Sequence, residues 1–175
     1  RTIYPIPLGL SCSFDPELAK NCSRMAAREA GASGVQVTFT PMVDYARDPR
    51  WGRVMECCGE DPMLSGDLGA AQVEGFQGDD LKKPENLAAC VKHFAGYGGA
   101  EAGRDYNLVE RSERELREFY LPAYKACIDA GAQLLMPSFN SLNGIPSVAN
   151  PWLMQKILKE EWNYQGLVIS DYDAL

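Results

Sequence analysis

The sequence predicts an α/β fold that forms part of a (β/α)8 TIM-like barrel, and three observations lead to this class. Segments of helical and strand character alternate along the whole 175-residue chain. The predicted strands are nearly continuous apolar runs, which is typical of a parallel sheet covered by helices. Polar and charged residues follow the strands, whereas the connections from helices to strands are short. This asymmetry is typical of barrels whose chemistry lies at the carboxyl ends of the strands.

The first half of the chain supplies two predicted helices and two predicted strands. Residues 15–32 begin with Asp15 as an N-cap, followed by a proline at the first helical position. Residues 34–41 are a β-rich run that ends in a proline. A long loop follows, then a predicted helix over residues 63–78 and a predicted strand over 87–94.

The second half repeats the alternation. Residues 112–131 are predicted to be helical, because Ser112 is followed three residues later by Glu115, as in a capping box, and a glycine ends the segment. The remaining expected elements are a strand over 132–139, a loop over 140–150, a helix over 151–163 with a proline at its start, and a last strand over 166–170.

The predicted elements are too few for a closed barrel. A (β/α)8 barrel takes about 250 residues and eight strands, whereas about four strand-helix steps are recognisable here. We therefore expect a partial barrel that is truncated at both ends. The alternative is a doubly wound open sheet, which normally has a phosphate-binding glycine turn after its first strand. The glycine-rich run over 96–103 does not have the required spacing.

Composition narrows the classes of partner. A net charge of -7 and the lack of a basic stripe argue against nucleic acid. No apolar run approaches the roughly 18 residues that a membrane span requires. With His93 as the only histidine and no CxxC pair among the six cysteines, we expect neither a metal site nor another cofactor. Cys90 and Cys127 lie in apolar segments and are expected to be buried thiols, and Cys57 and Cys58 form an unusual adjacent pair.

Lys92 and His93 lie at the end of a predicted strand and directly precede a glycine-rich loop. Such a pair can be a polar boundary with no further role. However, burying a lysine costs free energy unless its charge is needed, and the carboxyl ends of barrel strands carry the chemistry. We therefore favour a functional role for both residues.

The loop over residues 47–62 is rich in charge and contains Arg53 and Glu56, which are close enough in sequence to form an ion pair. Charge runs of this kind are often solvated ion pairs without a role. A tryptophan, two glycines and alternating charge signs instead suggest an ordered loop. An arginine held in this way would offer rigid hydrogen-bond donors to a polyhydroxylated ligand.

Asp171 follows the last predicted strand, where a carboxylate has a fixed direction. It could instead cap a helix or close a turn, a role that Asp173 could also fill. A metal ligand would need companions that the sequence lacks. A nucleophile or a general base is therefore the preferred interpretation of Asp171.

Several segments, taken in order, resemble glycoside hydrolase family 3, and more narrowly its β-glucosidase and β-xylosidase branch. They are "RTIYPIPLGL", "DPRWGRVMECCGEDP", "KHFAGYG", "LLMPSFNSLNG" and "GLVISDYDAL". The resemblance implies the N-terminal catalytic barrel of a retaining β-glycosidase, with Asp171 as the nucleophile. It also implies that Arg53, Lys92 and His93 bind the sugar and that Glu56 holds Arg53. The substrates would be oligosaccharides or aryl and alkyl β-glycosides, most simply terminal β-D-glucosides.

The resemblance also bears on the catalytic acid/base. One branch of the family uses a His-Asp dyad in the loop after "KHFPGHG", but Tyr97 stands where that motif has its second histidine, and His93 is the only histidine in the chain. In the glucosidase and xylosidase branch, a glutamate from a following α/β sandwich domain is the acid/base. We expect that C-terminal domain to be absent from this chain. Phe139 stands where many relatives carry tyrosine. The alternatives are β-xylosidase specificity, or a non-catalytic or unstable partial barrel that at most binds sugar weakly.

Overall fold

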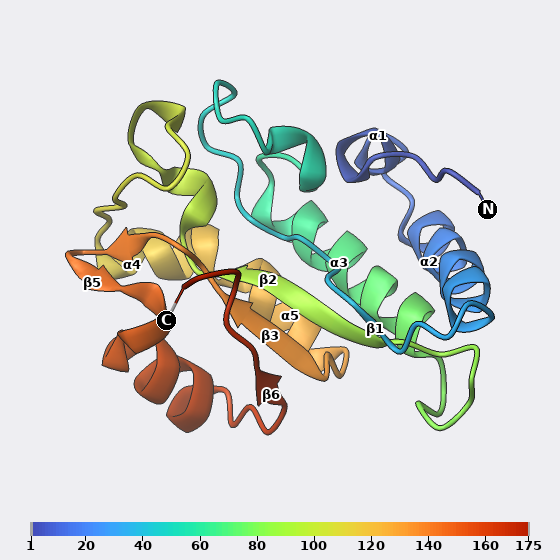
Figure 1. Cartoon of the computed structure of the whole chain (residues 1–175). Coiled ribbons are helices and arrows are strands. Elements are labelled where there is room, and N and C mark those ends of the chain that lie inside the picture. Colours follow the sequence, from blue (N-terminus) through green and yellow to red (C-terminus); the bar gives the residue numbers. More distant parts are fainter. Residues whose placement is uncertain (1, 175) are drawn as a thin grey trace.

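A computed structural model of the chain describes residues 2–174 and confirms the predicted α/β class. Its centre is a parallel sheet in the order β1-β2-β3-β6. The strands are β1 (Val37–Thr38), β2 (Ala88–Phe94), β3 (Leu134–Pro137) and β6 (Leu167–Val168). Each strand pairs with the next strand of this series along the chain, as in a barrel wall (Figure 1). The sheet is open among the described residues, in agreement with a partial barrel.

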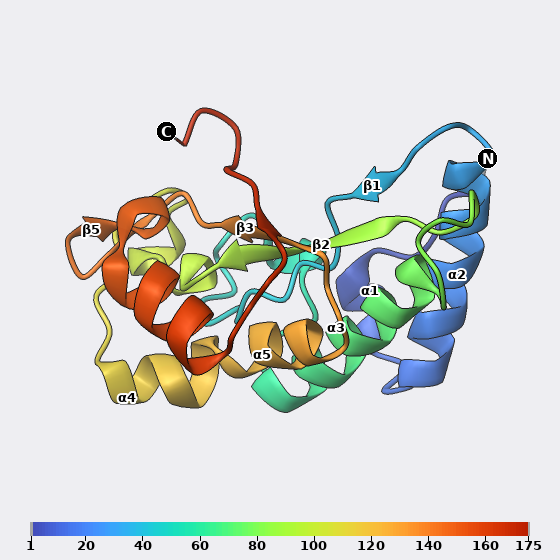
Figure 2. The ribbon, with the colours of Figure 1, turned by 90° about the horizontal axis from the view of Figure 1, so that it is seen from below.

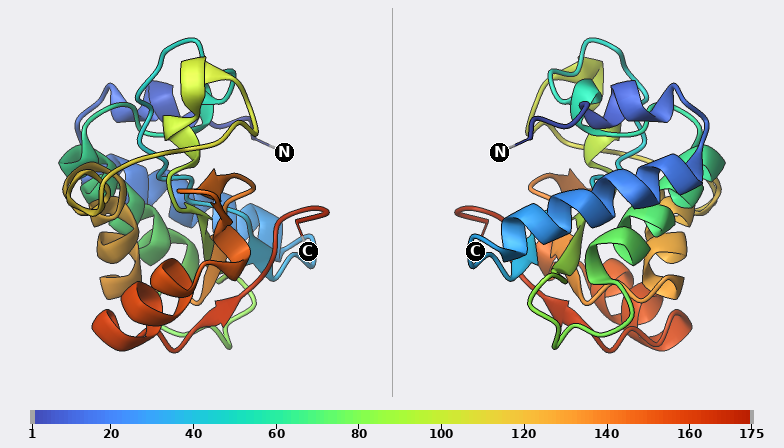
Figure 3. Two further views of the ribbon diagram at one scale, coloured as in Figure 1. Left: turned by 90° about the vertical axis from the view of Figure 1, so that its left-hand side faces the viewer. Right: turned by 90° about the vertical axis from the view of Figure 1, so that its right-hand side faces the viewer.

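The longer helices lie on one side of this sheet (Figure 2). They are α2 (Pro16–Gly31), α3 (Pro62–Gln77), α5 (Pro122–Asp129) and the π-helix η6 (Trp152–Glu161). Helix α2 packs along α3 (Figure 3). Gly75 permits this close approach, because a Cβ atom there would lie 2.4 Å from the carbonyl oxygen of Lys20.

The alternating side chains of the strands divide the apolar residues between two faces of the sheet. On the helix side, Val91 and Leu135 belong to the main core, together with residues of α3 and α5. On the opposite side, Cys90, Leu134 and Met136 form a smaller cluster. That second face corresponds to the interior of a barrel.

The predicted caps of two helices are confirmed. The Asp15 side chain accepts a hydrogen bond from the backbone N–H of Leu18 at 3.0 Å, before α2. The Ser112 hydroxyl accepts one from the backbone N–H of Glu115 at 3.2 Å. Both side chains satisfy amides that have no partner within the helix.

The segment predicted to be helical over residues 112–131 is helical, but it is not one regular α-helix. The segment divides into α4 (Glu113–Glu115), a π-helical turn (Leu116–Tyr120, η4) and α5. Pro122 explains the division, because proline has no N–H to donate and its ring clashes with the preceding turn. The turn widens accordingly, and the N–H of Leu121 donates to the carbonyl of Leu116 at 2.9 Å.

The outer strands are shorter than predicted. The run over 34–41 contributes only β1, since Pro41 cannot donate to the ladder. The chain nevertheless continues beside β2, where the N–H of Lys92 donates to the carbonyl of Pro41 and the N–H of Val43 donates to that of Lys92. The run over 166–170 contributes only β6, and Leu167 is 62% exposed, so the prediction of a buried last strand is also wrong.

The segment over residues 140–150, predicted to be a loop, contains a hairpin. Strands β4 (Ser141–Leu142) and β5 (Ile145–Pro146) are antiparallel, and Asn143 and Gly144 join them with φ values of 51° and 80°. Asn-Gly is the preferred pair for such a turn. The remaining short elements are α1 (Pro7–Ser11) and the 3-10 turns η1 (Val54–Glu56), η2 (Tyr97–Gly99), η3 (Glu101–Gly103) and η5 (Ser147–Ala149).

No helix in the described part of the chain is both long and apolar enough to span a bilayer.

Candidate functional site

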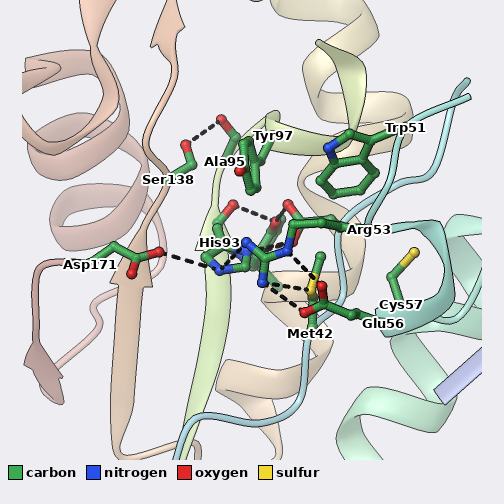
Figure 4. Close-up of polar contacts among 12 residues, drawn as sticks. Met42, Trp51, Arg53, Glu56, Cys57, His93, Ala95, Tyr97, Ser138 and Asp171 are labelled. Atoms are coloured by element: carbon green, nitrogen blue, oxygen red, sulfur yellow. Dashed lines mark hydrogen bonds and ion pairs between the residues drawn. The ribbon is translucent and has the colours of Figure 1, made fainter. Parts of the chain in front are cut away.

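Residues from separate segments meet at the carboxyl ends of β2 and β6. The loop after β1 brings Arg53 and Glu56, strand β2 brings His93, and the turn after β6 brings Asp171 (Figure 4). This is the end of the sheet at which a barrel carries its chemistry. The sequence analysis predicted roles for these four residues in separate segments of the chain, and the fold places them together.

His93 is the best-fixed side chain of this group. Only 1% of it is exposed, and its Nδ1 lies 2.9 Å from Oδ2 of Asp44. The backbone N–H of His93 donates to the same carboxylate oxygen at 3.0 Å. The other oxygen of Asp44 accepts from the Tyr124 hydroxyl at 2.9 Å. A carboxylate only accepts hydrogen bonds, so Nδ1 carries a proton and Nε2 is the ring nitrogen that faces the site.

Asp171 lies opposite that ring nitrogen. Its Oδ2 is 3.4 Å from Nε2 of His93, and its side chain is 15% exposed. Its Oδ1 accepts from the backbone N–H of Tyr172 at 2.7 Å. Strand β6 ends at Val168, so Asp171 lies in the following turn and not at the last residue of a strand. The direction of the carboxylate is therefore set by the turn and by His93.

The ion pair expected between Arg53 and Glu56 is present and bidentate. Nε and Nη2 of Arg53 donate to the two carboxylate oxygens at 2.8 and 2.7 Å. This hydrogen bonding raises the pKa of Arg53 and lowers the pKa of Glu56. The positive charge of Lys92 lowers the pKa of Glu56 further. The guanidinium lies 5.5 Å from the centroid of the Tyr97 ring, and its Nη1 lies 3.5 Å from Nε2 of His93. Arg53 is thus a fixed cation beside His93, whose Nε2 also faces Asp171.

Lys92 is partly buried on β2. Its ammonium group is not ion-paired with any carboxylate of residues 2–174, whereas its backbone is bonded to the chain that follows β1. A partly buried ammonium group without a carboxylate partner is available to a ligand.

Aromatic rings form one wall of the site. The His93 ring meets Tyr97 edge-on, with centroids 5.1 Å apart, and Phe139 lies 6.3 Å from His93. Asp105 joins this wall to the neighbouring loop, because its Oδ1 accepts from the Tyr97 hydroxyl and, at 3.1 Å, from Trp51 Nε1. Phe139 therefore lies near the histidine ring and offers no hydroxyl.

The adjacent cysteines face different parts of the interior. Cys57 packs with Met42, Trp51 and Tyr97, whereas Cys58 belongs to a cluster with residues of α2 and α3. Both are free thiols, and burial raises the pKa of Cys57 to about 12 and that of Cys58 to about 11. Thiols of this kind act as small apolar groups. Cys90 and Cys127 are buried free thiols too, as expected.

Sequence reasoning missed Asp44, Tyr124 and Asp105. Asp44 lies three residues after the predicted strand over 34–41, and Asp171 lies directly after the predicted strand over 166–170. That position was the available signal. No cluster of three potential metal ligands occurs among residues 2–174.

Comparison with known proteins gives the family. The model of the glycosyl hydrolase family 3 N-terminal domain matches residues 1–175. A periplasmic β-glucosidase of Salmonella typhimurium is 42% identical over 175 residues, which cover all of this chain and 23% of that protein. A β-xylosidase of Formosa agariphila is 39% identical, over 97% of this chain and 24% of that protein.

A solved structure supports the same family. The β-glucosidase of Listeria innocua in complex with glucose has a TM-score of 0.97 and 54% sequence identity, over 99% of this chain and 24% of that protein. The chain thus spans about a quarter of the length of the relatives that it matches. It belongs to glycoside hydrolase family 3, as part of the N-terminal domain of that family.

Proposed function

We propose that this chain forms the nucleophile-bearing, sugar-binding part of a retaining β-glycosidase that hydrolyses terminal β-D-glucosides. The observation that carries the proposal is the position of the Asp171 carboxylate in a chain of this family: it lies 3.4 Å from Nε2 of His93, and the cationic Arg53 lies 3.5 Å from the same ring nitrogen. β-Glucosidases of Salmonella typhimurium and Listeria innocua are among its relatives, and the structure of the latter contains glucose.

The reaction proceeds by double displacement. A carboxylate oxygen of Asp171 attacks the anomeric carbon while the bond from that carbon to the glycosidic oxygen breaks, and an acid donates a proton to the leaving oxygen. Water then attacks the same carbon and gives its proton to the former acid. The bond to Asp171 breaks, and the carboxylate is regenerated.

Arg53, Lys92 and His93 bind the sugar in this proposal. The guanidinium is held by Glu56 and stays protonated, and Nε2 of His93 is already directed toward Asp171. Contacts from such fixed groups need no rearrangement when the oxocarbenium-like transition state forms. They therefore favour the transition state over the ground state.

The acid/base lies outside residues 1–175 in this proposal, and the carboxylates that contact Arg53 and His93 support that view. A general acid needs a raised pKa, but the Arg53 hydrogen bonds lower the pKa of Glu56. Asp44 is fully buried behind His93 and cannot reach a substrate. A glutamate from a further domain of the complete protein would supply the proton.

β-Xylosidase specificity is the second candidate, since the Formosa agariphila relative carries that name. The two sugars differ by the hydroxymethyl group on C5, so the choice depends on what surrounds that carbon.

The test is covalent trapping in the complete gene product. A dinitrophenyl 2-deoxy-2-fluoro-β-glucoside needs no proton for its leaving group, so an impaired acid/base does not hide the nucleophile. We expect the fluorosugar on the peptide that contains Asp171, identified by mass spectrometry. Asp173→Asn should label as the wild type does, whereas Asp171→Asn should not label.

Each other result has a defined meaning. A label on a different carboxylate would refute the role of Asp171. Labelling by the xyloside analogue alone would replace glucose by xylose in the proposal. If neither analogue labels the protein, the proposed retaining hydrolysis of these two kinds of glycoside is refuted.

A further inference from the structure

Asp44 is a buried acid that the reaction as described does not use. Its side chain is fully buried, and among the described residues its carboxylate is paired with His93 and with no lysine or arginine. Burying a carboxylate costs free energy unless hydrogen bonds satisfy it. Here three groups do so: His93 Nδ1, the His93 backbone N–H, and the Tyr124 hydroxyl.

These hydrogen bonds determine how the histidine is presented. Because Asp44 accepts at Nδ1, Nε2 is directed to the side on which Asp171 and Arg53 lie, at 3.4 and 3.5 Å. The backbone bond from His93 to the same oxygen fixes the main chain as well as the ring. The ring therefore has one tautomer and one orientation before any ligand arrives.

We propose that Asp44 is a positioning residue, which acts through His93 to keep the hydrogen on Nδ1 and to direct Nε2 at the sugar beside Asp171. This inference rests on the proposed function. The competing interpretation is that Asp44 only stabilises the fold, by joining the loop after β1 to Tyr124 on α5.

A double-mutant cycle separates these two interpretations. The readout is kcat/KM for a dinitrophenyl β-glucoside, measured on the complete gene product as wild type, Asp44→Ala, His93→Ala and the double variant. If Asp44 acts through the ring, Asp44→Ala costs about 10- to 100-fold in the presence of His93. It should cost less than about threefold once the ring is gone.

Asp44→Asn is the conservative variant. Its amide oxygen can accept both His93 bonds, and its amide nitrogen can donate to the Tyr124 oxygen, because that hydroxyl is also within 2.6 Å of the His93 carbonyl and can donate there. We expect it to recover most of the activity that Asp44→Ala loses. Asp48→Asn is the matched control, since Asp48 lies on the same loop but pairs with Arg50. Its kcat/KM should stay within about twofold of the wild type.

Equal losses from Asp44→Ala in both backgrounds, or an Asp44→Asn as impaired as Asp44→Ala, would overturn the inference. A second measurement applies if Asp44→Ala does not fold. Histidine-selective 15N labelling of the wild type, with His93→Gln for assignment, should show the proton on Nδ1. A neutral ring protonated on Nε2 would overturn the inference directly.

The outcomes also distinguish this inference from the proposed function. If the wild type fails to react with the fluorosugars, the proposed function fails. If the wild type reacts and the cycle shows no coupling, only the role of Asp44 fails.

Discussion

The two sides of the site differ in how firmly the chain holds them. On the β2 side, His93 is buried and hydrogen-bonded to Asp44, and Arg53 is bound to Glu56 through two contacts. On the β6 side, Asp171 follows a two-residue strand whose Leu167 is 62% exposed, and its carboxylate meets His93 at 3.4 Å. The chain therefore holds the proposed sugar-binding side firmly, whereas the proposed nucleophile depends on the turn after an edge strand.

The largest expected effect is a difference in kcat between variants of the two aspartates on the β6 side. Asp171→Ala should lower the kcat of the complete gene product by about 10⁴-fold or more, because it removes the attacking atom. Asp173→Ala should leave most of the activity, since no role in the reaction falls to that exposed residue. Steady-state hydrolysis of an aryl glucoside measures both, and equal losses would remove the basis for assigning Asp171.

The next largest expected effect is a difference in kcat/KM between variants of two ion pairs on one loop. Arg53→Ala should lower kcat/KM by about 100-fold, because a fixed cation is lost beside the sugar. Arg50 pairs with Asp48 on the same loop but is 71% exposed, so Arg50→Ala should change kcat/KM by less than about twofold. The same aryl glucoside serves for both variants. A similar loss in both would mean that the loop, and not the Arg53 cation, matters.

A stability comparison contrasts a central strand with the edge strand. Leu135 on β3 is fully buried, so Leu135→Ala should lower the free energy of unfolding of the 175-residue chain by about 2–5 kcal/mol. Leu167→Ala removes an exposed side chain and should cost less than about 0.5 kcal/mol. Urea unfolding followed by circular dichroism measures both. Equal costs would show that β6 is buried as deeply as the centre of the sheet.

The smallest effect concerns acid stability. Hydrogen bonds from Arg53 lower the pKa of Glu56 in the folded chain. Folded Glu56 therefore binds fewer protons than the unfolded residue, whose pKa is about 4.3. Its contribution to stability is present above that value and is lost as the pH falls through the lower folded-state pKa.

Glu56→Gln should accordingly lose less stability than the wild type between about pH 5 and pH 3. Urea midpoints at the two pH values test this, with Glu17→Gln on the exposed side of α2 as the control. A wild-type midpoint that falls no more than that of Glu56→Gln would contradict the lowered pKa.

Local patterns predicted the regular parts of this molecule well. Asp15 and Ser112 cap helices as expected, and the spacing of Arg53 and Glu56 indicated their ion pair. Two further features were also readable, because Pro122 interrupts a helix and Asn143-Gly144 favours a hairpin turn.

The remaining features depend on contacts between distant residues. The bond from Asp44 to His93 joins positions 49 residues apart, and that from Asp44 to Tyr124 joins positions 80 apart. No spacing along the chain indicates such pairs. The exposed edge of β6 was missed for a related reason, since an apolar run looks the same whether or not a neighbouring strand covers it.

The most direct test of this account is a crystal structure of the complete gene product after reaction with the 2-fluoroglucoside. We predict a bond between the Asp171 carboxylate and the anomeric carbon, in the α configuration, with Arg53 and Nε2 of His93 within hydrogen-bonding distance of the sugar hydroxyls. A sugar bonded to another carboxylate, or one that lies away from His93, would contradict the account.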